Sequence, residues 1–241
     1  MKCLIFDAGG VLVYPRMGDW NLSPRLAELL GPHAPDIHTA KYLSAHRACL
    51  DWLDESRLVN SLEDERLLKR QYFIDMDRRM GWRLTRSEIL ALADDFTDNT
   101  ARYAMFPDAL TWLTRWQPRY RLGLLSDAMP SLLPALDGLG LSPLLEKKVI
   151  STRVGATKPN PRMYQAILQA MEAQPGDCLF VDDRIDNLEG AQAAGIRAVQ
   201  MARSEFPPAK VWDGETVKSF EELNALLERR CNRGWTAGVL R

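Results

Sequence analysis

An aspartate stands near the start of this chain, where a short apolar run meets a pair of glycines. The run Cys3–Phe6 precedes Asp7, and Gly9 and Gly10 follow it. An aspartate can act as a covalent nucleophile towards phosphorus, because an aspartyl-phosphate divides a difficult transfer into two easier steps. The glycines leave the backbone free to bend closely around a ligand. Asp7 is therefore our candidate nucleophile.

Polar residues that follow three further apolar runs complete the candidate set. They are Ser126 and Asp127 after Tyr120–Leu125, Lys158 within ten residues of Lys148–Ile150, and Asp182 and Asp183 after Cys178–Val181. Helical patterns lie between the runs, which predicts that the strands are parallel. Because the carboxyl ends of parallel strands share one edge of a sheet, where ligands bind, we expect these side chains to meet in one pocket.

The residue types suit the transfer of a phosphoryl group. A carboxylate and a phosphate repel each other, so the site needs positive charge, which Lys158 can supply. Asp182 and Asp183 fit part of a Mg²⁺ site, since Mg²⁺ prefers oxygen ligands and bridges carboxylates to phosphate. Ser126 and the backbone N–H groups after Asp7 can donate hydrogen bonds to phosphate oxygens. Phosphoryl transfer depends mostly on such positioning and neutralisation of charge.

Each of these residues also has a purely structural interpretation. Asp183 alone would more often cap a helix, because a helical pattern opens around Asn187. Lys158 would be an exposed lysine in a turn, and Ser126 with Asp127 would cap a helix that starts near Pro130. The ordered set, rather than any single residue, favours the functional interpretation.

Four stretches of the sequence carry a resemblance to a known family. In order they read FDAGGVL, LLSDA, GATKPNP and FVDDRIDN, and they resemble the four motifs of the haloacid dehalogenase-like (HAD) hydrolase superfamily. The resemblance covers about residues 1–15 and 106–203. It implies an α/β fold with a doubly wound parallel sheet of strand order 3-2-1-4-5, in which the strand before Asp7 is the middle one.

The resemblance also implies a function and a set of site residues. The function is Mg²⁺-dependent removal of phosphate from a small phosphorylated metabolite, through an aspartyl-phosphate at Asp7. The catalytic residues would be Asp7, Ser126 and Lys158. The metal would be held by Asp7, Gly9, Asp182 and Asp183, and the substrate by Gly9, Gly10, Asp127 and Asn187, of which Asn187 matches the DDxxxN pattern.

Gly9 departs from the pattern of the superfamily. The residue two positions after the nucleophile ligates the metal through its backbone carbonyl, and its side chain, usually that of aspartate, is the general acid and base. Glycine at this position keeps the carbonyl but lacks the side-chain proton donor. General acid–base catalysis is typically worth about 10²–10⁴-fold, so we expect slow turnover or another source of the proton.

Helical patterns replace the alternation of strands and helices between Pro15 and Phe106. They cover Pro24–Leu30, His38–Trp52, Ser61–Met80 and Ser87–Ala104, with no β-rich stretch among them. Ser23 is the expected N-cap of the first helix, and Thr85 with Glu88 fits a capping box before the last. The resemblance implies a helical cap domain inserted after the first strand, able to close on a substrate and exclude water. We expect a core domain of residues 1–15 and 106–241 and a cap domain of residues 16–105.

Large side chains are frequent in the cap region, and we expect most of them to pack between its helices. Three residues close to the first crossing into the cap are kept as candidates for contact with a substrate. Trp20 is kept as an aromatic contact, and Arg16 and Asp19 could touch the leaving group.

Length and charge narrow the class of protein. The chain has 241 residues, 46% of them hydrophobic, and 31 basic against 32 acidic residues leave a formal charge of −1. The balanced charge and the lack of a long Lys/Arg run argue against a nucleic-acid partner. No apolar run approaches the roughly 18 residues of a membrane span, and the first residues do not resemble a signal peptide. We therefore expect a cytoplasmic monomer or homodimer.

Two other functions stay open. A metal-independent haloacid dehalogenase would use Asp7 to attack carbon, but it would have no need of the adjacent Asp182 and Asp183. A catalytically weak binding or regulatory protein of the same superfamily is the other alternative, because Gly9 replaces the usual general acid and base.

Overall fold

The computed structural model describes residues 2–55 and 58–232 and contains a parallel sheet. Within the described residues six strands form this sheet. In spatial order they are β5 (Lys147–Ile150), β4 (Arg121–Ser126), β1 (Cys3–Phe6), β6 (Cys178–Asp182), β7 (Arg197–Met201) and β8 (Thr216–Val217). All neighbouring pairs are parallel. The first five have the order predicted from the sequence, with the strand before Asp7 in the middle.

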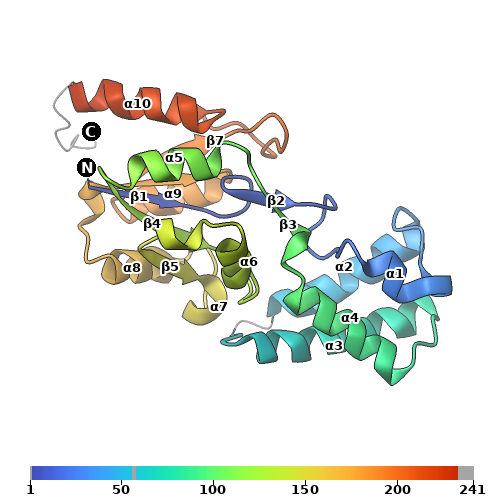
Figure 1. The fold of residues 1–241 in the computed structure, drawn as a ribbon. Coiled ribbons are helices and arrows are strands. Elements are labelled where there is room, and N and C mark those ends of the chain that lie inside the picture. The colour runs from blue at the N-terminus through green and yellow to red at the C-terminus, as the bar shows by residue number, and fades with distance from the viewer. Residues whose placement is uncertain (1, 56–57, 233–241) are drawn as a thin grey trace. The chain divides into compact units, whose positions relative to one another are not determined.

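Helices cover both faces of the sheet (Figure 1). On one face, α5 (Ala109–Trp116) and α10 (Phe220–Asn232) pack against β1. The ring of Phe6 lies 6.0 Å from that of Trp116 and 5.8 Å from that of Phe220, measured between centroids. On the other face, α8 (Pro161–Ala170) and α9 (Ile185–Ala193) bury Ile5 and Phe180. Burial of both faces explains why these strands read as short, continuous apolar runs.

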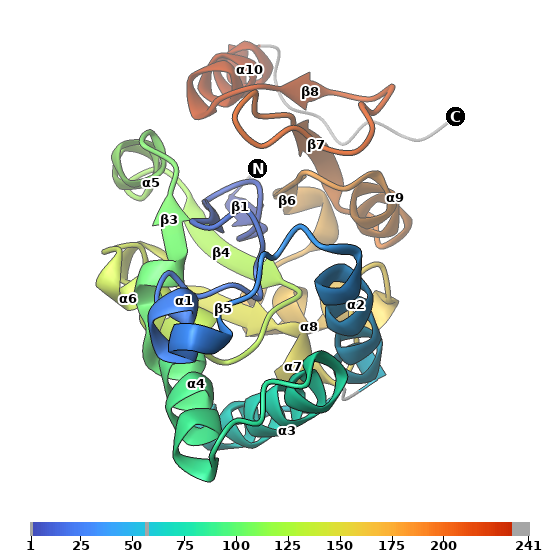
Figure 2. The same cartoon turned by 90° about the vertical axis from the view of Figure 1, so that its right-hand side faces the viewer.

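The edge strand β8 is absent from our sequence-based prediction. It pairs with β7 through Gln200 and Met201, and it lies close to the start of α10 (Figure 2). Its two residues are too few to produce a periodic pattern, so only the pairing with β7 identifies it. The shorter helices of this part are α6 (Leu132–Gly138) and α7 (Ser151–Val154).

The chain divides into two compact units. Unit 1 comprises Met1–Tyr14, Met105–Ala128 and Leu136–Arg241, and unit 2 comprises Pro15–Ala104 and Met129–Ala135. The strands β2 (Val13–Pro15) and β3 (Tyr103–Met105) pair with each other where the chain leaves unit 1 and returns to it. Residues 129–135, which the sequence analysis assigns to the core domain, group with unit 2. The role of unit 2 as a cap stays a prediction.

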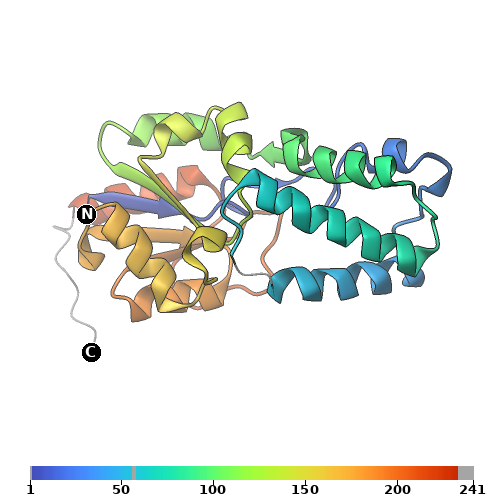
Figure 3. The ribbon, with the colours of Figure 1, turned by 90° about the horizontal axis from the view of Figure 1, so that it is seen from below.

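Unit 2 is helical and has a hydrophobic core of its own. Its helices are α1 (Leu26–Leu30), α2 (Ala40–Glu55), α3 (Leu62–Met80) and α4 (Arg86–Asp98), and α3 lies beside both α2 and α4 (Figure 3). Leu30, Cys49, Phe73, Met76 and Phe96 are among the side chains buried between these helices. Capping boxes begin two of the helices, from Ser61 for α3 and from the predicted Thr85 with Glu88 for α4.

Three predictions for unit 2 are wrong: the end of the last helix, the absence of a strand and the N-cap of the first helix. The last helix ends at Asp98 instead of Ala104, because the side chain of Asn99 accepts the N–H of Ala101 at 3.1 Å and starts a 3₁₀ turn, after which the chain forms β3. A strand therefore exists where we expected none.

Ser23 is not the N-cap of the first helix, which begins at Leu26. Its hydroxyl donates to the carboxylate of Asp95 and accepts the N–H of Arg25. The hydroxyl that the local sequence predicted as a helix cap is therefore bonded to a residue 72 positions away.

None of the helices in the described part of the chain is both long and apolar enough to cross a membrane.

Candidate active site

The ends of the three central strands lie at one edge of the sheet, as the sequence predicts. Phe6 is paired with Leu124 of β4 and with Val181 of β6, so Asp7 and Asp182 come level with each other. The N–H of Asp7 donates to the carbonyl of Val181 at 2.9 Å, which continues the ladder by one residue beyond β1. Candidate residues far apart in the sequence therefore gather within unit 1.

Lys158 lies at the centre of this gathering. Its Nζ is 2.8 Å from Oδ1 of Asp7, 2.7 Å from Oδ2 of Asp182 and 3.1 Å from the carbonyl oxygen of Leu125. Only 1% of its side chain is exposed. The interpretation of Lys158 as an exposed turn lysine is therefore wrong, because the ammonium group links the ends of β1, β4 and β6.

Asp127 helps to place this lysine. Its Oδ1 accepts the backbone N–H of Lys158 at 2.9 Å, while the side chain is otherwise exposed. Ser126 is buried at the end of β4, and its hydroxyl acts to lower the pKa of Asp7. Neither residue caps a helix, since α6 begins only at Leu132.

Asp182 is held from several sides by groups of the protein. Besides Lys158, its Oδ1 accepts the N–H of Arg184 at 2.8 Å, and Nδ2 of Asn187 lies 3.1 Å from Oδ1 and 3.0 Å from Oδ2. The carbonyl of Asn187 in turn accepts the hydroxyl of Tyr164 at 2.7 Å. Asn187 thus orients Asp182, and Tyr164, which no motif of the sequence indicates, supports Asn187.

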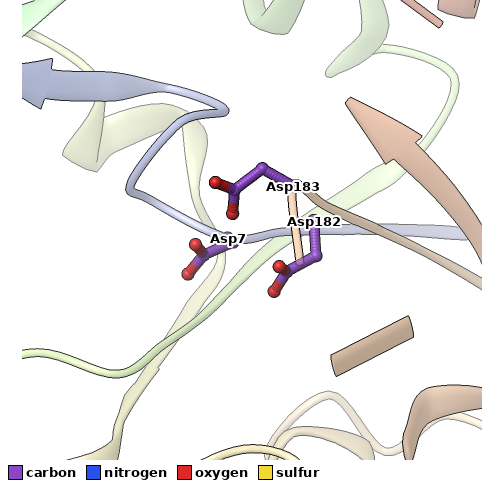
Figure 4. Close-up of side chains that lie close together, drawn as sticks. All are labelled: Asp7, Asp182 and Asp183. Carbon is purple, nitrogen blue, oxygen red and sulfur yellow. The ribbon is translucent and has the colours of Figure 1, made fainter. Parts of the chain in front are cut away.

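Asp183 completes a group of three carboxylates. Each of Asp7, Asp182 and Asp183 offers an oxygen, and these oxygens lie within 4.8 Å of one another (Figure 4). Asp183 does not cap the following helix, because the N-cap of α9 is Arg184 and it has no side-chain cap. This is the one such group of potential metal ligands in residues 2–55 and 58–232.

Gly10 allows the loop after β1 to approach Asp183. Its φ is +68°, a left-handed conformation that suits glycine. A Cβ atom at this position would come within 2.7 Å of Oδ2 of Asp183, closer than real contacts allow. Gly10 therefore places the loop against the carboxylate of Asp183.

The three carboxylates carry more negative charge than Lys158 can balance. Burial, and the neighbouring charge of Asp182, raise the pKa of Asp7 to about 6 although Lys158 and Ser126 act to lower it. Burial and the charges of Asp7 and Asp182 raise the pKa of Asp183 to about 8. Burial acts to lower the pKa of Lys158, but Asp182 and Asp7 raise it above its ordinary value. The cluster therefore favours an additional cation, and its all-oxygen donor set is of the kind that Mg²⁺ prefers.

The candidates near the first crossing into unit 2 make contacts within that unit. Nε of Arg16 donates to the carbonyl of Ala101 at 2.7 Å. Asp19 accepts the N–H of Asn21 at 2.7 Å, and its Oδ2 lies 3.3 Å from Nε2 of His46. The ring of Trp20 lies 6.0 Å from that of Tyr103. Contact of Trp20 with a substrate, and of Arg16 and Asp19 with a leaving group, stays a prediction.

Comparison with known proteins identifies the family. A family model described as haloacid dehalogenase-like hydrolase matches residues 1–195. Phosphatase MT3486 of Mycobacterium tuberculosis is 35% identical over 126 residues, which cover 51% of this chain and 56% of that protein. A phosphoserine phosphatase of Thermus thermophilus is 34% identical over 119 residues, 48% of each chain. The matched regions thus span about half the length of these curated relatives.

A solved structure matches nearly the whole chain. It is the L-2-haloacid dehalogenase of Xanthobacter autotrophicus, with a TM-score of 0.65, 19% identity, and coverage of 98% of this chain and 100% of that one. At this identity the likeness establishes the fold alone.

Proposed function

This chain belongs to the family of haloacid dehalogenase-like hydrolases, and on that premise we propose that it removes phosphate from a small phosphorylated metabolite, with Asp7 as the nucleophile. The observation that carries the proposal is the contact of Lys158 with both Asp7 and Asp182, next to a third carboxylate, Asp183. Relatives named as phosphatases support the choice of phosphorus as the electrophile.

The reaction proceeds in two displacements. A carboxylate oxygen of Asp7 attacks phosphorus, an O–P bond forms, and the bond from phosphorus to the ester oxygen breaks. Water then attacks the phosphorus of the aspartyl-phosphate, and phosphate leaves as Asp7 is regenerated. Gly9 offers no side-chain donor, so the departing alkoxide must take its proton from another source, such as water.

The other residues neutralise charge and orient groups. The ammonium group of Lys158 stabilises the negative charge that gathers on the phosphoryl group. The hydroxyl of Ser126 and the N–H groups of the loop after Asp7 donate to its oxygens. Asp127 and Asn187 act through their hydrogen bonds to Lys158 and Asp182.

A Mg²⁺ ion fits the surplus of negative charge in this cluster. Asp7, Asp183 and the carbonyl of Gly9 are the groups that would hold it, while the oxygens of Asp182 already accept bonds from Lys158, Asn187 and Arg184. When bound, the ion would neutralise the carboxylates and polarise a phosphoryl oxygen.

We further propose that unit 2 acts as the cap. Support comes from its helical composition, its separate hydrophobic core, and its insertion between the strand before Asp7 and the strand that ends at Ser126. The side chains that select the substrate would then lie on residues 16–105.

A panel of substrates tests the activity. The protein is incubated with p-nitrophenyl phosphate, O-phosphoserine and sugar phosphates, with Mg²⁺ or with EDTA, and in parallel with 2-chloropropionate. Phosphate release that requires Mg²⁺ is the expected result. Chloride release that persists in EDTA would identify a dehalogenase instead, and Mg²⁺ binding without any turnover would identify a binding protein.

A further inference from the structure

A buried arginine contacts the loop after Asp7 from a distant part of the chain. Arg203 follows β7, and only 4% of it is exposed. Its Nε lies 3.2 Å and its Nη2 lies 2.9 Å from the carbonyl oxygen of Val11, four residues after Asp7. Arg203 lies beyond residues 1–195, which match the family model, and no sequence motif singles it out.

Asp108 and two aromatic rings also contact the guanidinium group. Nη1 donates to Oδ2 of Asp108 at 3.2 Å, and Nη2 lies 3.0 Å from Oδ1 of the same carboxylate. The rings of Phe106 and Phe220 lie 4.1 Å and 4.7 Å from the guanidinium carbon. Asp108 balances the charge of Arg203 and two rings cover its guanidinium group, so its contact with the loop after Asp7 is the pair of hydrogen bonds to Val11.

The loop that Arg203 holds carries backbone groups of the candidate site. The carbonyl of Ala8 accepts the N–H groups of Leu12 and Val13 at 2.9 Å each, which closes a tight turn. Gly10 lies inside this turn, directly against the carboxylate of Asp183. A shift of the Val11 carbonyl would therefore move the backbone of residues 8–10 relative to Asp7 and Asp183.

Stability alone is a poor explanation for this arrangement. A buried ion pair often contributes no more stability than well-packed apolar side chains of the same volume, whereas a bidentate arginine fixes the direction of its partner. Two N–H groups on one carbonyl, from a guanidinium oriented by Asp108, restrict where Val11 can lie.

We propose that Arg203, oriented by Asp108, is a positioning residue that fixes the loop of residues 8–11 for binding of the cation and the phosphoryl group. The inference rests on the proposed function, since it assigns the loop to that site.

Binding measurements on Arg203→Met and Arg203→Lys test the proposal without relying on turnover. Isothermal titration gives the Kd of Mg²⁺ and of inorganic phosphate in the presence of Mg²⁺, and the KM for p-nitrophenyl phosphate is measured alongside. We expect both Kd values and the KM to rise about tenfold in Arg203→Met, the equivalent of about 1.4 kcal/mol. Arg203→Lys, which keeps the charge but not the fork, should give a rise of about threefold.

Arg121→Met is the matched control. Arg121 is also an ion-paired arginine of unit 1, bonded to Glu146, but it lies at the opposite end of β4 from Ser126. Its loss should leave both Kd values and the KM at the parental level.

The outcomes separate the possible failures. If Arg203→Met lowers only the thermal stability and the amount of active protein, with parental Kd and KM values, Arg203 is structural and the inference is overturned. Should Arg203→Met fail to fold, Arg203→Lys decides, and parental constants in that variant overturn the inference as well. A parental protein that binds neither Mg²⁺ nor phosphate overturns both the inference and the proposed function.

Discussion

Unit 1 and unit 2 each bury a cluster of charged side chains, and the two clusters differ in how their charge is balanced. In unit 2, the carboxylate of Glu65 accepts the backbone N–H of Ser131 at 2.7 Å and its hydroxyl at 2.6 Å. The guanidinium of Arg102 lies 3.7 Å from Glu65 and donates to the same hydroxyl at 2.6 Å. One negative and one positive group thus meet around one hydroxyl.

The cluster of unit 1 lacks this balance. Three carboxylates surround one lysine, and the pKa values of Asp7 and Asp183 rise to about 6 and about 8. A charge that is balanced inside the protein serves the fold, because it needs nothing from outside. A buried surplus of charge of one sign destabilises the fold, so it indicates a site for a ligand of the opposite charge.

Asp7→Asn should show most clearly that the cluster of unit 1 serves activity and not the stability of the fold. The amide keeps the shape of the side chain but lacks the nucleophilic oxygen, so phosphate release should fall by at least about 10³-fold, as losses of single catalytic groups do. The fold should persist, measured by circular dichroism and thermal unfolding. Asp177→Asn, at the far end of the sheet, is the control. Hydrolysis of p-nitrophenyl phosphate at the parental rate by Asp7→Asn would disprove the nucleophile.

Glu65→Gln should have the opposite effect: it should lower the stability of the fold and leave the site of unit 1 intact. It leaves Arg102 buried without a neighbouring carboxylate, although its hydrogen bonds to Trp20 and Ser131 remain, and this costs about 3–5 kcal/mol of unfolding free energy. Denaturant unfolding measures the loss, and the Kd of Mg²⁺ should stay at its parental value. Glu63→Gln on the same helix removes an exposed ion pair with Arg66 and should cost less than about 1 kcal/mol. Equal losses in the two variants would show that the Glu65 cluster does not stabilise the fold.

Gly9→Asp tests whether a missing proton donor limits turnover. The φ of Gly9 is not positive, unlike that of Gly10, so its backbone conformation is not one that favours glycine. We expect kcat to rise about tenfold, the lower part of what general acid catalysis supplies. Gly9→Asn controls for the added volume. If Gly9→Asp is no faster than Gly9→Asn, the proton comes from another source.

The dependence of stability on pH should also reveal the surplus negative charge of unit 1, with the smallest effect of the four tests. The pKa values of Asp7 and Asp183 rise from 3.8 to about 6 and about 8, so the folded ion-free protein binds more protons than the unfolded chain between about pH 4 and pH 8. Its stability should therefore fall as the pH rises through this range. Mg²⁺ should raise the Tm by several degrees at pH 8 and by less at pH 5.5, measured by calorimetry.

Asp183→Asn is the matched variant for this measurement. With one carboxylate removed, the Tm should change less with pH, and Mg²⁺ should have little effect at either pH. A Tm gain from Mg²⁺ that is the same at pH 5.5 and pH 8 in the parental protein would contradict the surplus.

Local sequence determined much of the fold and of the site. The apolar runs predicted strands β1, β4, β5 and β6 to within a residue at either end. The prediction is clearest for β1, whose four residues are all apolar and buried. Parallel strands then brought Asp7, Ser126, Lys158, Asp182 and Asp183 to one edge of the sheet. The capping box at Thr85 was equally readable, since its partners lie three residues apart.

Only the tertiary structure decided which groups satisfy one another. The approach of Gly10 to Asp183, the orientation of Asp182 by Asn187, and the contact of Arg203 with Val11 leave no trace in the spacing of residues. Arg203 and Val11 are 192 residues apart. They meet because both follow the carboxyl ends of parallel strands, β7 and β1, of the same sheet. A local sequence pattern reflects how one segment buries its own apolar side chains. Contacts between distant residues depend instead on where the sheet and its helices bring their segments together.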